Sequence, residues 1–267
     1  VVGGADQGDA GGAAERRFPG DPHGLARQHG RVAVEDLAAR FGVTVQTIRK
    51  DLNMLCERGA LKRTHGGAMH PSGGENVEYE ARRQIAPAEK RAIGKAAAAL
   101  IPDHASLFIN IGTTTEAVGQ ALSEHRGLMV ITNNINVANH LRVVPSTEVV
   151  IAGGVVRPSD GGIVGEAAVD FIRQFKVDFA VIGVSAIDPD GALLDFDFRE
   201  VKVAQAIIAN ARHVIVVADQ TKFTRTAPVR IGHLSQAHSF ITDICRVDSI
   251  REVCADAGIA LIETGAA

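Results

Sequence analysis

The sequence predicts an α/β protein in two parts, a small N-terminal module and a larger, mostly parallel α/β domain. Two short amphipathic helical patterns flank a glycine between residues 34 and 52, and a Gly-Gly hairpin pattern follows at 59–69. From residue 89 onward, apolar strands alternate with amphipathic helices, a pattern typical of a parallel sheet covered on both faces. The 267 residues suffice for two domains of common size.

Composition divides the chain into four segments. Residues 1–24, rich in Gly, Ala and Asp, are expected to form a disordered tail. The small module occupies 25–70, a linker rich in Pro and Gly occupies 71–88, and the α/β domain occupies 89–263. Within the linker, residues 78–84 have the pattern of a short helix.

The small module begins with two helices. The apolar residues Leu37 and Phe41 share one face of the first helix, which is expected to stop at Gly42. Thr44 is a suitable N-cap for the second helix, in which Ile48 and Leu52 have the spacing of a buried stripe. Long hydrogen-bonding side chains, suited to base edges and phosphates in a DNA major groove, then gather on the opposite face.

A basic hairpin follows the second helix. The segment GALKRTHGGAM, residues 59–69, predicts two short strands that turn at Gly66 and Gly67. Residues 16–70 hold ten Lys and Arg against five Asp and Glu, whereas residues 71–267 hold eighteen against twenty-three. The net charge of −3 is therefore the sum of a basic small module and an acidic larger domain.

Together these features predict a winged helix-turn-helix that binds double-stranded DNA. The alternative is an ordinary helical hairpin with a solvated outer face. Gln46 and Arg49 are expected to read bases, and the other polar residues to position the backbone. The candidate DNA-binding residues are Thr44, Gln46, Thr47, Arg49, Lys50, Asn53, Lys62, Arg63 and His65.

The larger domain has six apolar segments that are expected to form strands and six amphipathic segments that are expected to form helices. The strands are 107–111, 129–132, 149–152, 179–184, 214–218 and 240–242. The helices are 89–100, 115–125, 137–141, 167–175, 201–211 and 249–257.

The carboxyl ends of these strands carry residues suited to a phosphate. Ligands of open α/β sheets bind outside those ends, and a glycine followed by hydroxyl side chains at a helix N-terminus can hold an anion. Each feature alone has a simpler explanation, such as a tight turn with a capping threonine or a solvated lysine. The candidate phosphate-binding residues are Gly112, Thr113, Thr114, Thr115, Asn133, Asn134, Gly153, Gly154 and Lys222.

Several other kinds of site and setting are not indicated. The three scattered cysteines fit neither a disulfide framework nor zinc, and we expect no metal, no cofactor and no catalytic residue. No apolar run approaches the roughly 18 residues that span a bilayer. A cytoplasmic protein without membrane contact is therefore expected.

The ordered motifs TVQTIRKDL, LKRTHGGA, INIGTTT, TNN, IAGG, GGIVGEA and DQTKF resemble the DeoR family of bacterial transcriptional regulators. The resemblance extends from about Leu25 to Ile262. It implies an N-terminal winged helix, a C-terminal sensor related in fold to ribose-5-phosphate isomerase, and a homodimer or homotetramer. It also implies repression that a phosphorylated effector relieves, for which glycerol 3-phosphate is expected.

This sequence departs from the family pattern in three places. Prolines at 19 and 22 stand where the family has its first helix. Lys50 replaces a second arginine, and Ala204-Gln205 replaces a Lys-Arg pair.

Two alternatives stay open. The effector could instead be a sugar phosphate such as fructose 1-phosphate. The chain could also be a phosphosugar isomerase, since fold does not settle function. The acid and base for isomerisation would then come from Asp188, Asp190, Asp195, Asp197 and Glu200. We favour the interpretation of this acidic stretch as a solvated loop and helix start, because a basic winged helix has no purpose on an isomerase.

Overall fold

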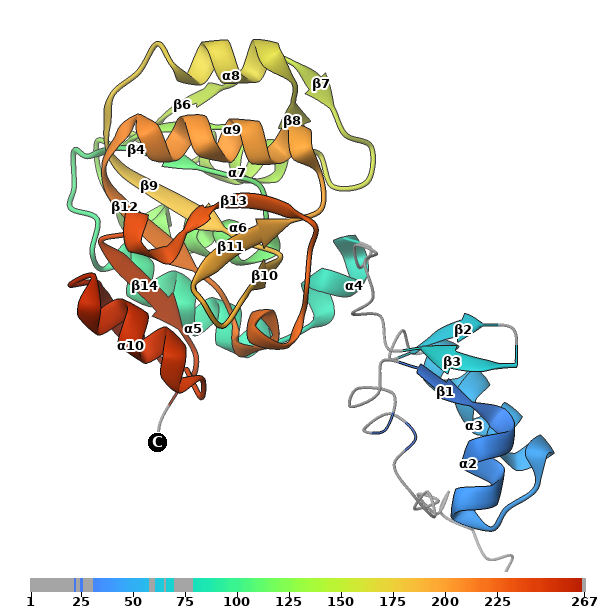
Figure 1. Ribbon diagram of the computed structural model, residues 1–267. Coiled ribbons are helices and arrows are strands. Elements are labelled where there is room, and N and C mark those ends of the chain that lie inside the picture. The colour runs from blue at the N-terminus through green and yellow to red at the C-terminus, as the bar shows by residue number, and fades with distance from the viewer. Residues whose placement is uncertain are drawn as a thin grey trace, which may run out of the picture. The chain divides into compact units, whose positions relative to one another are not determined.

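The computed structural model describes residues 22, 25, 31–57, 61–64, 66–69 and 79–265 (Figure 1). The chain forms two compact units, Val1–His70 and Pro71–Ala267. The tail expected at 1–24, with Pro19, lies almost wholly outside the described residues, and so does the part of the expected linker at 71–78. The helix expected at 78–84 is present at Tyr79–Gln84.

The first unit is a small helical module closed by a three-stranded sheet. It contains β1 (Arg31–Ala33), α2 (Val34–Phe41), α3 (Val45–Glu57), β2 (Lys62–Thr64) and β3 (Gly67–Met69). The antiparallel strands lie in the order β1-β3-β2. This arrangement confirms the helix-turn-helix and its hairpin, and β1 is a strand that the sequence did not predict.

Local sequence sets the boundaries of the two helices. α2 ends at Gly42, whose φ of 63° is the left-handed conformation that glycine adopts without strain. Thr44 begins α3 as predicted, because its hydroxyl accepts a hydrogen bond of 3.2 Å from the amide of Thr47. Leu37, Ile48 and Leu52 form the buried centre between the helices. The hairpin turn was placed one residue too late: Gly66 turns with a φ of 78°, whereas Gly67 already pairs with Thr64.

The second unit has a seven-stranded parallel sheet in the order β15-β14-β12-β9-β4-β5-β6. Its strands are β4 (Ser106–Ile109), β5 (Met129–Thr132), β6 (Glu148–Ile151), β9 (Val177–Gly183), β12 (Ala211–Val217), β14 (Ser239–Thr242) and β15 (Ala260–Glu263). The helices are α4 (Tyr79–Gln84), α5 (Pro87–Ala98), α6 (Thr113–Ala121), α7 (Ile135–Leu141), α8 (Glu166–Ile172), α9 (Phe198–Ala209) and α10 (Asp248–Asp256), with the 3-10 turns η1 (Leu122–Glu124), η2 (Gln220–Thr224) and η3 (Leu234–Gln236).

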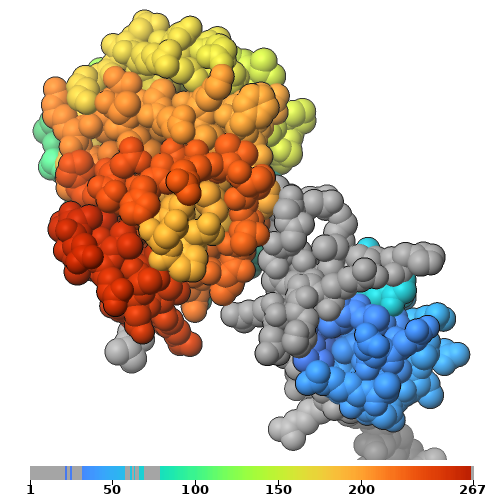
Figure 2. Space-filling view, viewed as in Figure 1, coloured from blue at the N-terminus to red at the C-terminus, as the bar shows by residue number. Residues whose placement is uncertain are grey.

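Alternate residues of the strands face two separate cores. Leu107 and Ile109 of β4 pack with α5, α6 and α7, whereas Phe108 between them packs with α8, α9 and α10. The central strands are consequently apolar along their whole length, as expected of a sheet that is covered on both faces. Figure 2 shows one surface of this unit, formed largely by α8, α9 and α10 in yellow, orange and red.

The structure confirms the predicted α/β class and all six predicted strands and helices of this unit, with ends shifted by up to a few residues. The sequence did not reveal β15, nor the two small antiparallel sheets. These are β7 (Val155–Val156) with β8 (Ile163–Val164), and β10 (Ala186–Ile187), β11 (Ala192–Asp195) and β13 (Val229–His233) in the order β10-β11-β13. Strands of two to five residues are too short to show a periodic pattern.

Candidate functional site

One face of α3 carries the polar side chains that were predicted to contact DNA. Ile48 and Leu52 are buried on the inner face of the helix. The exposed residues on its outer face and N-terminal turn are Thr44, Gln46, Thr47, Arg49, Lys50 and Asn53. The helix thus presents amide, guanidinium and ammonium donors together, which is the side-chain chemistry that base edges and phosphates accept.

The hairpin of the first unit carries the remaining candidate cations. Arg63 lies in β2 and is exposed. The side chain of Lys62 and all of His65 lie outside the described residues. Only Arg63 among the three candidate hairpin residues can therefore be placed on the surface of this unit.

The second unit has a small pocket at the carboxyl ends of β4 and β9. It brings together the first turn of α6, the segment after β9, and residues of α4, β11, α9 and η2. The residues that line it are Arg82, Ile111, Gly112, Thr113, Thr114, Gly183, Val184, Ser185, Asp195, Glu200 and Lys222. Four of the candidate phosphate residues, Gly112, Thr113, Thr114 and Lys222, therefore meet in one place.

Gly112 lines the pocket at the N-terminus of α6. It precedes α6 with a φ of 145°, a conformation that side chains with a Cβ rarely adopt. The first N–H groups of a helix have no carbonyl partner within it, and they carry the positive end of the helix dipole. Thr115 faces inward instead, where its hydroxyl donates to the carbonyl oxygens of Asn110 and Gly112, 2.8 Å from each.

Lys222 extends a buried cation into the same pocket. Its side chain is only 8% exposed, and among the described residues its ammonium makes no hydrogen bond or ion pair. Burial lowers the pKa of Lys222 to about 8, although the nearby charge of Asp219 opposes the change. Asp219 caps η2 by accepting from the amide of Thr221 at 3.1 Å, which fixes the turn that carries Lys222.

Arg82 of α4 contributes a second cation to the pocket. Its Nη2 donates to Asp160 at 3.1 Å, while its Nε is buried and has no hydrogen-bond partner in the described part of the chain. Three further hydrogen bonds hold α4 in place. The Tyr79 hydroxyl donates to Glu116 at 2.8 Å and accepts from Asn136 at 3.0 Å. The ammonium of Lys90 donates to the Arg82 carbonyl at 2.5 Å. Burial and the hydrogen bond to Glu116 raise the pKa of Tyr79.

The carboxylates of the pocket depart from the solvated loop that we expected. Asp195 and Glu200 are 5% and 7% exposed, because β11 and the first turn of α9 pack them inside the domain. Burial raises the pKa of Asp195, and burial together with the charge of Asp195 raises the pKa of Glu200 to about 8. Asp190 and Asp197 do fit the expected turn and helix start, since they accept from the amides of Ala192 and Arg199.

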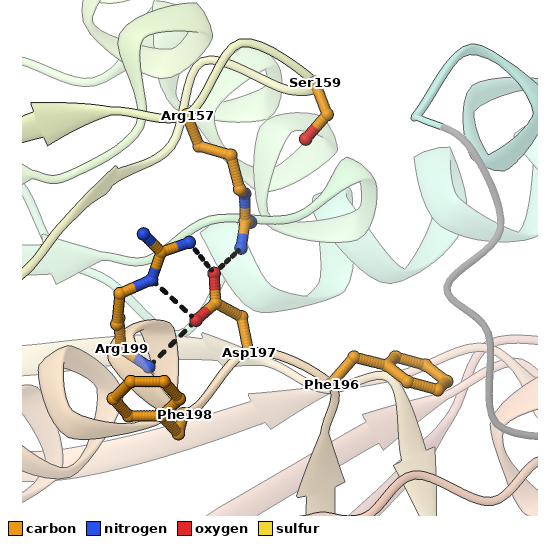
Figure 3. Close-up of a pocket in the computed structure, with 6 residues that line it drawn as sticks. All are labelled: Arg157, Ser159, Phe196, Asp197, Phe198 and Arg199. Carbon is orange, nitrogen blue, oxygen red and sulfur yellow. Dashed lines mark hydrogen bonds and ion pairs between the residues drawn. The ribbon is translucent and has the colours of Figure 1, made fainter.

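Arg157 forms ion pairs with three carboxylates of this acidic region. It binds Asp160 through two nitrogens at 2.8 and 2.7 Å, Asp197 at 3.1 Å and Glu200 at 2.5 Å. In Figure 3, Arg157 and Arg199 converge on Asp197 beside an open groove, with Phe196 and Phe198 pointing to opposite sides. The hydrogen bonds from Arg199 outweigh partial burial and lower the pKa of Asp197 to about 2.

The other candidate phosphate residues lie outside the lining of the Lys222 pocket. Asn133 donates to the carbonyl of Ile163 at 3.0 Å, and Asn134 caps α7 by accepting from the amide of Asn136 at 2.9 Å. Gly153 and Gly154 are exposed residues before β7. The structure therefore does not bring these four residues to the pocket that contains Lys222.

Sequence reasoning did not select Arg82 or Ser185 for this pocket. Arg82 lies in a short helix far from the strand ends along the chain, and Ser185 is one residue in an unremarkable loop. The signal that could have suggested Arg82 is the arginine pair Arg82-Arg83 immediately before the α/β region.

No helix in the described residues is long and apolar enough to cross a membrane. The same residues contain no group of three or more His, Cys, Asp or Glu side chains that could hold a metal ion.

Comparison with known proteins assigns the class of protein. The model of the DeoR-like helix-turn-helix domain matches residues 24–73, and that of the DeoR C-terminal sensor domain matches residues 85–244. The chain belongs to the DeoR family.

Among its relatives are two proteins named glycerol-3-phosphate regulon repressor. That of Escherichia coli (strain K12) is 46% identical over 89% of this chain and 94% of its own. That of Haemophilus influenzae is 50% identical over 82% of this chain and 85% of its own. A solved structure of ribose 5 phosphate isomerase A from Neisseria gonorrhoeae matches at 12% identity and a TM-score of 0.37, covering 51% of this chain and 53% of that chain.

Proposed function

We propose that the protein is a transcriptional repressor that binds double-stranded operator DNA and releases it when a phosphorylated metabolite binds. The effector in this proposal is glycerol 3-phosphate, which the relatives' names support. The proposal includes a homodimer or homotetramer that acts in the cytoplasm. The observation that supports a phosphorylated effector is the buried Lys222 beside the first turn of α6, whose ammonium makes no hydrogen bond within the described residues.

The DNA-binding half of the proposal rests on the exposed face of α3. Arg49 and Gln46 would contact base edges, because their forked or paired donors match the edges of guanine and adenine. Lys50 and Arg63 would contact phosphates, which fixes the register of the protein on the duplex.

The effector half rests on the chemistry of the pocket. Free N–H groups at the start of α6 and the ammonium of Lys222 suit the phosphate of the effector. Gly112 allows the phosphate to approach the backbone closely, since it lacks a Cβ. A phosphate would also supply the hydrogen bonds that Lys222 does not make within the described part of the chain.

The small size of the pocket implies that effector binding moves part of its lining, and this movement is how we propose that the effector weakens DNA binding. Its volume of about 20 Å³ holds roughly one water molecule, so an organic phosphate enters only if part of the lining moves. Arg82 is the lining residue from α4, the described helix that directly follows the connection to the first unit. In the proposed mechanism the effector phosphate attracts Arg82, and α4 shifts with it.

Operator release tests the proposal. A binding duplex is first selected from a random-sequence pool with the full-length protein, and its affinity is then followed by fluorescence anisotropy. Added glycerol 3-phosphate should weaken binding to the selected duplex at least tenfold, and inorganic phosphate should do so much less. Failure to select any duplex, or duplex binding that does not respond to salt, would refute the DNA-binding half.

The two alternatives have distinct outcomes in these assays. Release by fructose 1-phosphate but not by glycerol 3-phosphate would change the effector and keep the repressor. Turnover of ribose 5-phosphate by the purified protein would indicate an enzyme. The proposal assigns Asp195 and Glu200 no catalytic role, in keeping with relatives that are named as repressors.

A further inference from the structure

Asp160 lies in the loop between β7 and β8, outside the lining of the Lys222 pocket, and two arginines share it. Its Oδ2 accepts from Arg82 at 3.1 Å and from Arg157 at 2.7 Å. Its Oδ1 accepts from Arg157 at 2.8 Å and from the amide of Gly162 at 3.2 Å. The side chain of Asp160 is only 1% exposed. Asp160 is therefore a buried anion that binds Arg82 through only one of these four hydrogen bonds.

Arg82 belongs both to the pocket lining and to this ion pair. Within the described part of the chain, Asp160 is the one carboxylate at ion-pair distance from Arg82, and the Arg82 Nε has no hydrogen-bond partner there. Burial lowers the pKa of Arg225, and the charge of Arg82 adds to this effect, so other cations lie close to Arg82. Asp160 thus supplies the counter-charge that Arg82 has before an effector binds.

Arg157 allows the ion pair between Arg82 and Asp160 to open. Opening a buried ion pair is costly when it leaves a charge without partners. Asp160 would keep both hydrogen bonds from Arg157 and that from Gly162. Arg157 is itself fixed by Asp197 and Glu200, at 3.1 and 2.5 Å. Asp160 can therefore lose Arg82 and still be a compensated anion.

A phosphate in the pocket is a second anion for Arg82. It carries more negative charge than a carboxylate near neutral pH and offers more acceptor oxygens. The pocket volume of about 20 Å³ holds roughly one water molecule, so a phosphate enters only if the lining moves. Since Arg157 and Gly162 fix Asp160, a movement of Arg82 with the phosphate breaks the 3.1 Å contact.

We infer that Asp160 competes with the effector phosphate for Arg82, so that the ion pair between Arg82 and Asp160 keeps the pocket closed until the effector binds. The inference rests on the proposed function and adds a regulatory contact to it. An ion pair that exists only in the closed arrangement reduces the fraction of protein that is ready to bind, and the apparent affinity for the effector falls with that fraction. Removal of the carboxylate charge should therefore make the protein more sensitive to its effector.

Asp160→Asn in the full-length protein tests the inference, because the amide keeps the shape of the side chain and loses its charge. Calorimetry should show that the variant binds glycerol 3-phosphate at least threefold more tightly than the wild type does. A merely structural role of Asp160 would weaken ligand binding instead. Asp170→Asn, which removes an exposed ion pair with Arg173, is the matched control and should bind as the wild type does. Unchanged or weaker binding by folded Asp160→Asn would overturn the inference.

A double variant shows whether the gain in affinity depends on Arg82. When Asp160→Asn is added to Arg82→Gln, the affinity for glycerol 3-phosphate should not increase further, since no guanidinium remains to be set free. A threefold gain that persists in the double variant would contradict the inference.

Hydrogen exchange in the wild type provides a measurement that needs no variant. The contact between Arg82 and Asp160 joins α4 to the loop between β7 and β8. Its opening by saturating glycerol 3-phosphate should change the exchange rates of the α4 amides at least twofold. The amides of α10, which contributes no residue to the pocket lining, should keep their rates. Unchanged exchange in α4 would also overturn the inference.

Failure of the inference differs from failure of the proposed function. If glycerol 3-phosphate releases the operator from the wild type but Asp160→Asn behaves as the wild type does, only the competing role of Asp160 is wrong. If neither glycerol 3-phosphate nor inorganic phosphate binds to the wild type, the proposed effector site itself is wrong, and the inference is wrong with it.

Discussion

The Arg82 guanidinium lies 3.1 Å from the Asp160 carboxylate, and this contact joins α4 to the loop between β7 and β8. Both side chains are shielded from water, with exposures of 12% and 1%. Asp160 is also bound by Arg157 through two nitrogens. These hydrogen bonds and charges outweigh burial and lower the pKa of Asp160, so the carboxylate that holds Arg82 is ionised at neutral pH.

The first prediction concerns this link between the pocket and α4. Arg82→Gln removes the charge that would attract the effector phosphate, so the glycerol 3-phosphate concentration for half release of the operator should rise at least tenfold. Arg83→Gln lies in the same helix but is exposed and lies outside the pocket lining, so it is the matched control. Anisotropy titrations of both variants make the comparison. A wild-type response in Arg82→Gln would show that α4 takes no part in release.

The second prediction concerns Gly112, the glycine that precedes α6 in the pocket. Gly112→Val should produce a repressor that binds the operator but does not respond to effector, because a branched side chain resists a φ of 145° and fills the place of the anion. The measurement is operator release by glycerol 3-phosphate, with circular dichroism to verify folding. Gly153→Ala is the control variant and should release the operator normally, since a Cβ at Gly153 meets nothing within 4 Å. If a folded Gly112→Val protein still releases the operator normally, the effector phosphate binds at another place in the protein.

The third prediction concerns the exposed face of α3. Arg49→Ala should weaken binding to the selected duplex by about 1–3 kcal/mol and relax its sequence preference. Lys50→Ala should weaken all duplexes to a similar extent and reduce the dependence on salt. Arg91→Ala, an exposed arginine on α5, is the control. Affinities for selected and scrambled duplexes at several salt concentrations distinguish the two roles, and equal losses for both variants on both duplexes would contradict them.

The fourth prediction concerns pH. Lys222, with a pKa of about 8, is charged below pH 8 and neutral above it. Glu200, whose pKa is also about 8, becomes negative over the same range. Both changes weaken the binding of an anion, so the affinity for glycerol 3-phosphate should fall between pH 7 and pH 9.

Calorimetry at intervals across that range measures the effect. Lys222→Met should bind the ligand more weakly at pH 7, by about 1.5–3 kcal/mol for a charge-assisted contact, and should show a smaller decline toward pH 9. Lys95→Met, an exposed exchange on α5, should retain the wild-type profile. An affinity that is flat with pH in the wild type would place the phosphate away from Lys222.

The local sequence determined the helices and the main strands of the fold, and the face of α3 that is exposed. Gly42 and Thr44 act within one helical turn of their own positions, so their roles at the end of α2 and the start of α3 follow from the chain itself. The spacing of Ile48 and Leu52 fixes which face of α3 is buried, and thereby which face is exposed. The turn at Gly112 between β4 and α6 was predictable for the same reason, because a strand, a glycine and a helix start adjoin in sequence.

Only the tertiary structure decided which of the polar residues share a pocket. The order of the strands places β4 beside β9 and separates β14 from β4, and no local pattern encodes that order. It brings Lys222 and Glu200 to the turn at Gly112 and leaves Asn134 as a helix cap. Arg82 joins them because α4 packs back onto the domain. Burial then converts Asp195 and Glu200 from expected surface charges into pocket carboxyl groups with raised pKa, a change that depends on the surrounding atoms rather than on neighbouring residues in sequence.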